Sequence, residues 1–197
     1  MKILTALCLL CCAANLRAQR LDIAALQSRC LPGVPLTTLG AIIRVESGGN
    51  PNAMQIDFPR ALLKQWDLPE GTLRLKRQPT TKREALQWLE YFERRNISVD
   101  LGLMQVSTAE AHRRGLPAES LLDPCFNLRA GWQILDSAYQ LETKTYGPGQ
   151  EALQHAISRY NTGDTQRGID NGYLTRVMAA LKQGPATTSM TKGEGRR

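Results

Sequence analysis

Apolar side chains recur at helical spacing along most of this chain, and glycine or proline marks the end of each periodic stretch. Leu and Ile occupy helical positions over 21–30, and a Pro-Gly pair follows at 32–33. A second stretch begins near Leu36 and runs to about Ser47, where Gly-Gly-Asn-Pro ends it. Further helices are predicted from a capping box at 81–84, from 107 to about 115, from about 124 to 147, around 153–160, and over 173–181.

Three shorter stretches have a different pattern, in which apolar and polar residues partly alternate. Two of them cover 53–58 and 72–77 and are separated by Pro and Gly, and a third extended segment is predicted over 98–106. Short alternating stretches bounded by turn residues favour β-strands. The sequence therefore predicts one mainly helical α+β domain with a small β element.

The first eighteen residues have the pattern of a secretory signal peptide. Lys2 gives a positive start, 3–14 is an apolar run too short to span a bilayer, and Ala18 is a small residue at a plausible cleavage point. A buried N-terminal helix is the alternative. We predict a signal peptide over 1–18, a folded domain over 19–183 and a disordered basic tail over 184–197, with no transmembrane segment after cleavage.

The basic charge of the chain is concentrated near its ends. The 197 residues include 25 Lys and Arg against 18 Asp and Glu, a net charge of +7. Lys2 and Arg17 lie in the predicted signal peptide, and 182–197 holds four basic residues against one acidic residue, which leaves +2 for 19–181. Because the basic pairs within that domain are scattered, we do not expect it to bind nucleic acid.

The sequence offers no pattern for a metal or cofactor site. The two histidines, His112 and His155, are far apart and fall within predicted helices. No phosphate-binding loop, dinucleotide fingerprint or zinc-protease motif occurs. We therefore expect neither a metal nor a cofactor.

Two cysteines remain once the predicted signal peptide is removed. Cys30 and Cys125 form an even pair in a chain bound for an oxidising compartment, so we predict a disulfide between them. Two separately buried thiols are the alternative.

One carboxylate lies in line with an apolar helix face. Leu39, Ile42 and Ile43 form the core-facing stripe of the second helix, and Glu46 occupies the next position on that stripe. Partial burial and the negative end of the helix dipole would both raise the pKa of Glu46, as a general acid requires. The alternative is that Glu46 only marks the point where the helix meets solvent.

An ordered set of motifs surrounds this position. Glu-Ser-Gly-Gly-Asn-Pro at 46–51 is followed by Gly-Leu-Met-Gln at 102–105, then Tyr-Asn-Thr-Gly at 160–163, then Tyr173. Together they resemble the soluble lytic transglycosylase (SLT) family over about 22–181. The resemblance implies a goose-lysozyme-like α+β fold and cleavage of peptidoglycan glycan strands. The cysteine pair, the Pro-Gly-Val-Pro turn and the Asp-Pro-Cys-Phe-Asn-Leu run look most like the members that serve type IV secretion and conjugation systems.

The resemblance assigns roles to individual positions. Glu46 matches the single catalytic acid/base, Gln105 a residue that hydrogen-bonds sugar, and Tyr173 the tyrosine near the catalytic carboxylate. The other matched positions, all assigned to substrate binding, are Ser47, Met104, Tyr160 and Asn161. Arg159 departs from the family, where many members carry Ala, and we expect its side chain to project outward or, alternatively, to place positive charge beside the glycan.

These assignments imply a monomeric periplasmic enzyme that acts on peptidoglycan, with components of a secretion, conjugation or pilus system as possible partners. Hydrolysis of a glycosidic bond normally needs two carboxylates, and here only Glu46 has a clear assignment. The family's alternative is attack by the sugar's own 6-hydroxyl, which leaves a 1,6-anhydro product. Two rival interpretations stay open: a hydrolase in which Asp100 or another carboxylate orients a water, and a wall-binding scaffold in which catalysis is incidental.

Overall fold

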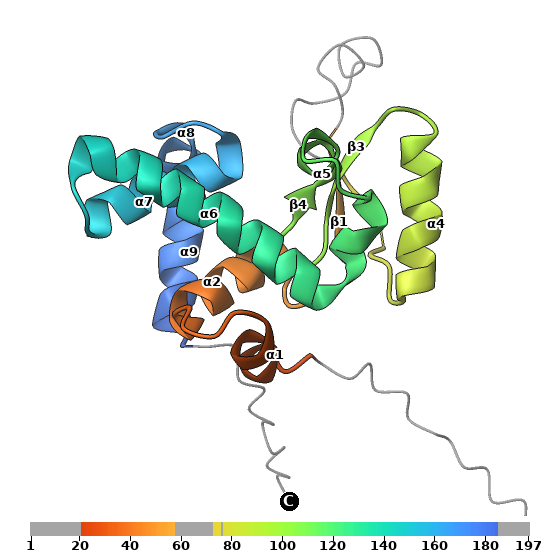
Figure 1. Ribbon diagram of the computed structural model, residues 1–197, viewed down its shortest axis with the longest axis horizontal. Coiled ribbons are helices and arrows are strands. Elements are labelled where there is room, and N and C mark those ends of the chain that lie inside the picture. The colour runs from red at the N-terminus through yellow and green to blue at the C-terminus, as the bar shows by residue number, and fades with distance from the viewer. Residues whose placement is uncertain (1–20, 58–72, 76, 185–197) are drawn as a thin grey trace, which may run out of the picture.

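The computed structural model describes residues 21–57, 73–75 and 77–184. The predicted signal peptide, and the predicted tail apart from Gly184, lie outside the described residues. Figure 1 shows the arrangement, in which the long helix α6 runs across the molecule from the α7–α9 helices to the sheet side. The described helices are α1 (Ile23–Cys30), α2 (Leu36–Glu46), α4 (Lys82–Glu93), α5 (Thr108–Arg113), α6 (Pro124–Tyr146), α7 (Gln150–Thr162), α8 (Arg167–Asp170) and α9 (Tyr173–Lys182), with a 3-10 helix, η1 (Ala118–Leu122).

Side-chain caps explain where several of these helices begin. The Thr81 hydroxyl accepts a hydrogen bond from the Glu84 N–H at the start of α4, as the capping box predicts. Asp123 accepts from the Phe126 N–H at the start of α6, where Pro124 takes the first helical position. Ser107 caps α5 in the same way through the Ala109 N–H. Local chemistry therefore fixes these boundaries.

The strands form one antiparallel sheet in the order β2-β1-β3-β4. Its strands are β1 (Met54–Asp57), β2 (Leu73–Arg74), β3 (Ser98–Leu101) and β4 (Val106–Ser107). The predicted β element over 53–58 and 72–77 is confirmed where the structure describes it. The extended segment predicted over 98–106 is wrong in its middle, because a tight turn at 102–105 divides it into β3 and β4. The two shortest of the described helices, η1 and α8, are not predicted by the sequence because they are too short to show a periodic pattern.

The helices that carry the predicted motifs pack around one apolar core. Leu39, Ile42 and Ile43 of α2 are fully buried, as the stripe predicted. Helix α2 packs against α9, and α6 packs against α7. Within the described residues, no helix is both long and apolar enough to cross a membrane.

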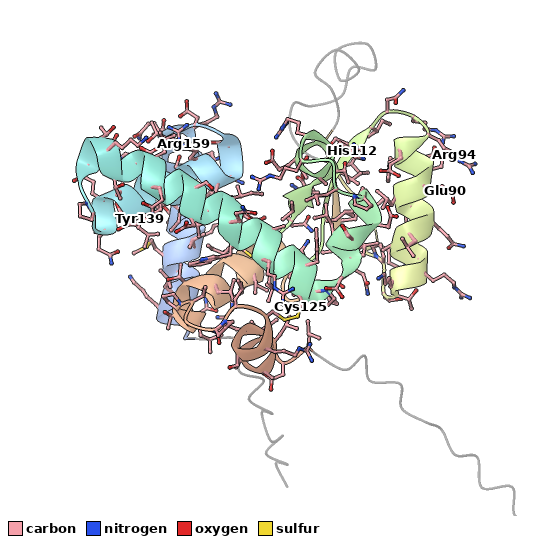
Figure 2. The ribbon with its side chains drawn as sticks, viewed as in Figure 1. Glu90, Arg94, His112, Cys125, Tyr139 and Arg159 are labelled. Carbon is pink, nitrogen blue, oxygen red and sulfur yellow. A yellow bond between two sulfur atoms is a disulfide. The ribbon has the colours of Figure 1, made fainter. Side chains whose placement is uncertain are left out.

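A disulfide joins Cys30 at the end of α1 to Cys125 in the first turn of α6, which confirms the predicted pair. Figure 2 shows this bond at the end of α6 that lies over α1. The Arg129 side chain adds a hydrogen bond from its Nε to the Cys30 carbonyl oxygen, at 3.1 Å. Both contacts attach the N-terminal helix to the main body of the domain.

Candidate active site

Glu46 is the last residue of α2, at the point where the chain leaves the core. The three residues that precede it on the same face are fully buried, whereas Glu46 itself is partly exposed. The next residue, Ser47, ends the helix, and its hydroxyl donates toward the carbonyl oxygens of Leu103 (2.8 Å) and Ile43 (3.1 Å). Ser47 thereby joins the end of α2 to the turn between β3 and β4.

That turn, residues 102–105, holds the Gly-Leu-Met-Gln motif in a tight backbone conformation. Gly102 has φ of +79° and Gln105 has φ of +48°, both in the left-handed region. The Gln105 side chain donates from Nε2 to the carbonyl oxygens of Gly102 (2.9 Å) and Ala53 (3.1 Å). Met104 is fully buried, and its side chain lies against Gly131 of α6. The motif is therefore a folded turn rather than a strand.

Two tyrosines from later helices lie at this junction. The Tyr173 hydroxyl, from the first residue of α9, donates a hydrogen bond to Oε1 of Glu46. The Tyr160 hydroxyl, from α7, donates to the Met104 carbonyl oxygen at 2.6 Å. The ends of α2, α7 and α9 and the turn at 102–105 thus meet around the Glu46 carboxylate.

Burial and nearby negative charges raise the pKa values of both tyrosines, Tyr160 and Tyr173. Burial raises the pKa of Tyr160 well above 10.0, and the negative charges of Glu46 and Asp100 raise it further. Burial also raises the pKa of Tyr173, followed by the charge of Glu46, the neighbouring Tyr160 and the hydrogen bond to Glu46. Both phenols therefore keep their protons at neutral pH and act as hydrogen-bond donors.

Asn161 belongs to a second small network next to Tyr173. Its Oδ1 accepts a hydrogen bond from Nδ2 of Asn171 at 3.2 Å, and Asn171 Oδ1 in turn accepts from the Tyr173 backbone N–H at 2.8 Å. Asn161 is exposed. The Asn171 side chain, which sequence reasoning missed, thus connects the Tyr-Asn-Thr-Gly motif to the start of α9.

Arg159 does not project outward as expected. Its Nε donates to Oε1 of Glu142 at 2.6 Å, and Glu142 is buried on α6 with only 3% of its surface exposed. The Thr165 hydroxyl donates to the other oxygen of Glu142 at 3.0 Å. Figure 2 shows Arg159 at the top of α7, next to α8. A buried carboxylate needs a cation and hydrogen bonds, and Arg159 supplies the cation.

Asn127 is the second residue that sequence reasoning missed. Its side chain is fully buried on α6 and holds the turn at 102–105 from the side of the core. The same signal that singled out Glu46 would have found it, because Asn127 is a polar residue four positions before Gly131 on the buried face of α6.

Two cavities in the described parts of the chain lie apart from this site. Among the described residues, no group of three or more His, Cys, Asp or Glu could hold a metal ion. A cavity of about 360 Å³ between α5, η1 and α6 contains none of the predicted site residues. A second cavity of about 320 Å³ between α2, α6 and α7 contains none of them either.

Comparison with known proteins agrees with the resemblance seen in the motifs. The family described as Transglycosylase SLT domain matches residues 24–175. Protein virB1 of Agrobacterium fabrum is 34% identical over 155 residues, which cover 78% of this chain and 57% of the relative. The type IV secretion system protein virB1 of Brucella abortus is 30% identical over 161 residues, which cover 79% of this chain and 62% of the relative.

The chain thus spans about three fifths of the length of these curated relatives. No solved structure shows significant similarity to it. The family match extends from the second residue of α1 into α9 and includes Glu46, the turn at 102–105, and both tyrosines. The family match and the observed elements together confirm the predicted fold class, a mainly helical α+β domain of the lysozyme-like type. This chain belongs to the transglycosylase SLT domain family.

Proposed function

We propose that this chain is a lytic transglycosylase that cleaves the β-1,4 bond between MurNAc and GlcNAc in peptidoglycan, with Glu46 as its acid/base. The observation that carries the proposal is the hydrogen bond from Tyr173 to Glu46, at the junction of α2, α9 and the turn at 102–105. Family membership supports the reaction class.

In the first step Glu46 acts as a general acid. Its carboxyl proton passes to the glycosidic oxygen as the bond between that oxygen and C1 of MurNAc breaks. The N-acetyl group of the same MurNAc stabilises the positive charge that develops at C1. A second protein carboxylate is not needed for this stage, in agreement with the single clear assignment at Glu46.

In the second step the Glu46 carboxylate acts as a general base. It takes the proton of the MurNAc 6-hydroxyl while O6 bonds to C1, so the product is a 1,6-anhydro sugar and Glu46 regains its proton. Tyr173 supports both steps because its protonated hydroxyl orients one oxygen of the carboxylate. Gln105 and the exposed Asn161 are proposed to bind the sugars that flank the broken bond.

Substitution of Glu46 by Gln tests the assignment. We expect Glu46→Gln to abolish release of soluble fragments from purified sacculi, while circular dichroism and thermal unfolding stay close to the wild type. Glu151→Gln is the matched control, because Glu151 is an exposed carboxylate in the first turn of α7. Full activity in Glu46→Gln would refute the assignment.

Hydrolysis by the same site is the second candidate, and one observation favours it. The charges of Glu46 and Asp100 both act on Tyr160, so two carboxylates lie within electrostatic range of one phenol. If Asp100 orients a water, digested sacculi will contain reducing ends, and Asp100→Asn will lose activity. Transglycosylation predicts 1,6-anhydro ends in the mass spectra and substantial activity in Asp100→Asn.

The biological setting is proposed from the relatives and the sequence. Four of the matched proteins are named for type IV secretion, and the predicted signal peptide would direct the chain to the periplasm. We propose that local opening of the wall allows an envelope-spanning system to assemble. A host strain that carries Glu46→Gln should then fail to assemble it. Normal assembly in that strain, with loss after deletion of the protein, would favour the scaffold interpretation.

A further inference from the structure

Asn127 makes three hydrogen bonds from one fully buried side chain. Its Oδ1 accepts from the Met104 backbone N–H at 2.8 Å. Its Nδ2 donates to the carbonyl oxygens of Leu101 at 2.7 Å and Leu121 at 2.9 Å. The amide therefore connects α6 to the end of β3, to the turn at 102–105, and to η1.

Asn127 contacts the turn at 102–105 from the core side. The other hydrogen bonds of this turn connect it to residues of the candidate site. The Leu103 carbonyl oxygen accepts from Ser47, next to Glu46, and the Met104 carbonyl oxygen accepts from Tyr160. The N–H of Met104 bonds to Asn127 while its C=O bonds to Tyr160. A shift of the amide would therefore displace the groups that surround Glu46.

The surroundings require an amide at this position. The Met104 N–H needs an acceptor, whereas the two carbonyl oxygens need donors, and Asn supplies both from one planar group. An Asp of the same shape would place an oxygen against two carbonyl oxygens inside the core. The space exists because residue 102 is Gly: a Cβ there would lie 2.4 Å from Asn127 Nδ2.

We propose that Asn127 is the positioning residue of the active site, which fixes the turn at 102–105 against Glu46 and thereby controls the rate of glycan cleavage. The inference rests on the proposed function. Displacement of catalytic groups by about 1 Å costs on the order of 100-fold in rate, so the effect should far exceed that of general destabilisation.

Asn127→Asp tests this, with Thr108→Val as the matched control. Thr108 is also buried at 2% exposure, and its hydroxyl bonds to the Val99 N–H and to Ser98, which lie outside the turn. On soluble glycan strands, with rates corrected for the folded fraction, we expect Asn127→Asp to lower kcat/KM about 100-fold, mainly through kcat. Thr108→Val should stay within about threefold of the wild type. Equal losses in the two variants would overturn the proposal.

If Asn127→Asp is unfolded at the assay temperature, Asn127→Ser replaces it, because Ser brings no charge into the core, and the same loss is expected. A second measurement does not depend on cleavage. Hydrogen exchange at the Met104 and Gln105 amides should be faster in the Asn127 variant than in Thr108→Val, and unchanged exchange would overturn the proposal. Absence of cleavage by the wild-type protein would instead refute the proposed function, and the exchange experiment would still test the positioning of the turn.

Discussion

Tyr173 lies 127 residues after Glu46 in the sequence, and its hydroxyl donates a hydrogen bond to the Glu46 carboxylate. The phenol must keep its proton to donate, and burial together with the charge of Glu46 raises its pKa well above 10.0. The pKa of Tyr160 is also raised well above 10.0, with burial as the largest cause. At the level of single residues, the candidate site therefore pairs one carboxylate with the neutral phenol of Tyr173, while the neutral phenol of Tyr160 bonds to the neighbouring turn at Met104.

The raised pKa of Tyr160 predicts how stability depends on pH. Above about pH 10 the unfolded chain loses this phenolic proton first, while the folded protein still holds it, so the free energy of unfolding falls as pH rises. Tyr160→Phe removes this contribution. Urea unfolding between pH 8 and 11.5 should therefore show a shallower decline for Tyr160→Phe than for the wild type. Parallel declines would contradict the assignment of a raised pKa.

Among the structural elements, the turn at 102–105 depends most on its neighbours. It follows β3 and precedes β4, and it contacts α2, α6 and α7 through Ser47, Asn127 and Tyr160. Its first residue, Gly102, combines a left-handed φ with close contact to the Asn127 amide. The turn is thus held by side chains from three helices as well as by its own strands.

Gly102→Ala, compared with Gly115→Ala outside the turn, separates the effect of the left-handed backbone from the effect of close packing at Gly102. Both glycines have a left-handed φ, +79° and +67°, but no atom lies within 4 Å of a Cβ at 115. Gly115→Ala should cost about 1 to 2 kcal/mol from backbone strain alone. Gly102→Ala should cost about 1 to 3 kcal/mol more, because its methyl group would collide with Asn127 and the Leu121 carbonyl oxygen. Denaturant unfolding measures both, and equal costs would show that the turn adapts to the added methyl group.

For the molecule as a whole, α6 connects the N-terminal helix α1, helix α7 and the sheet side. The Cys30–Cys125 disulfide fixes α1 at the first turn of α6, and Asn127 holds the sheet side. Near the other end of α6, Glu142 pairs with Arg159 of α7, and Figure 2 labels Cys125 and Arg159 at these two places. These contacts lie along one helix of 23 residues. The placement of the turn at 102–105 and of α7 next to Glu46 therefore depends on contacts made along this helix.

Removal of the disulfide should lower the stability of the whole domain. The bond closes a loop across 95 residues of sequence, and in the chain-entropy model such a loop contributes about 4 to 5 kcal/mol. We expect the Cys30→Ser, Cys125→Ser double variant to lose that amount in urea unfolding under oxidising conditions. The wild type in reductant should behave like the double variant. A loss below about 1 kcal/mol would show that the disulfide does not reduce the conformational entropy of the unfolded chain as this model requires.

Much of the local structure could be predicted because it depends on nearby residues. The apolar stripe of α2 and the caps at Thr81, Ser107 and Asp123 act over two to four positions, and each marks its element in the sequence. Glu46 was found by the same periodicity. The turn at 102–105 was missed because its conformation depends on an amide 23 residues away from Met104.

The sequence by itself determined the longer helices, the candidate acid Glu46, the cysteine pair and the motifs that identify the family. Tertiary structure alone decided which polar groups meet: Tyr173 with Glu46, Asn127 with the turn, and Arg159 with the buried Glu142. Periodicity and caps arise from interactions within one or two helical turns, so they can be read along the chain. Contacts between distant segments depend on how whole helix faces pack, which the local pattern does not specify.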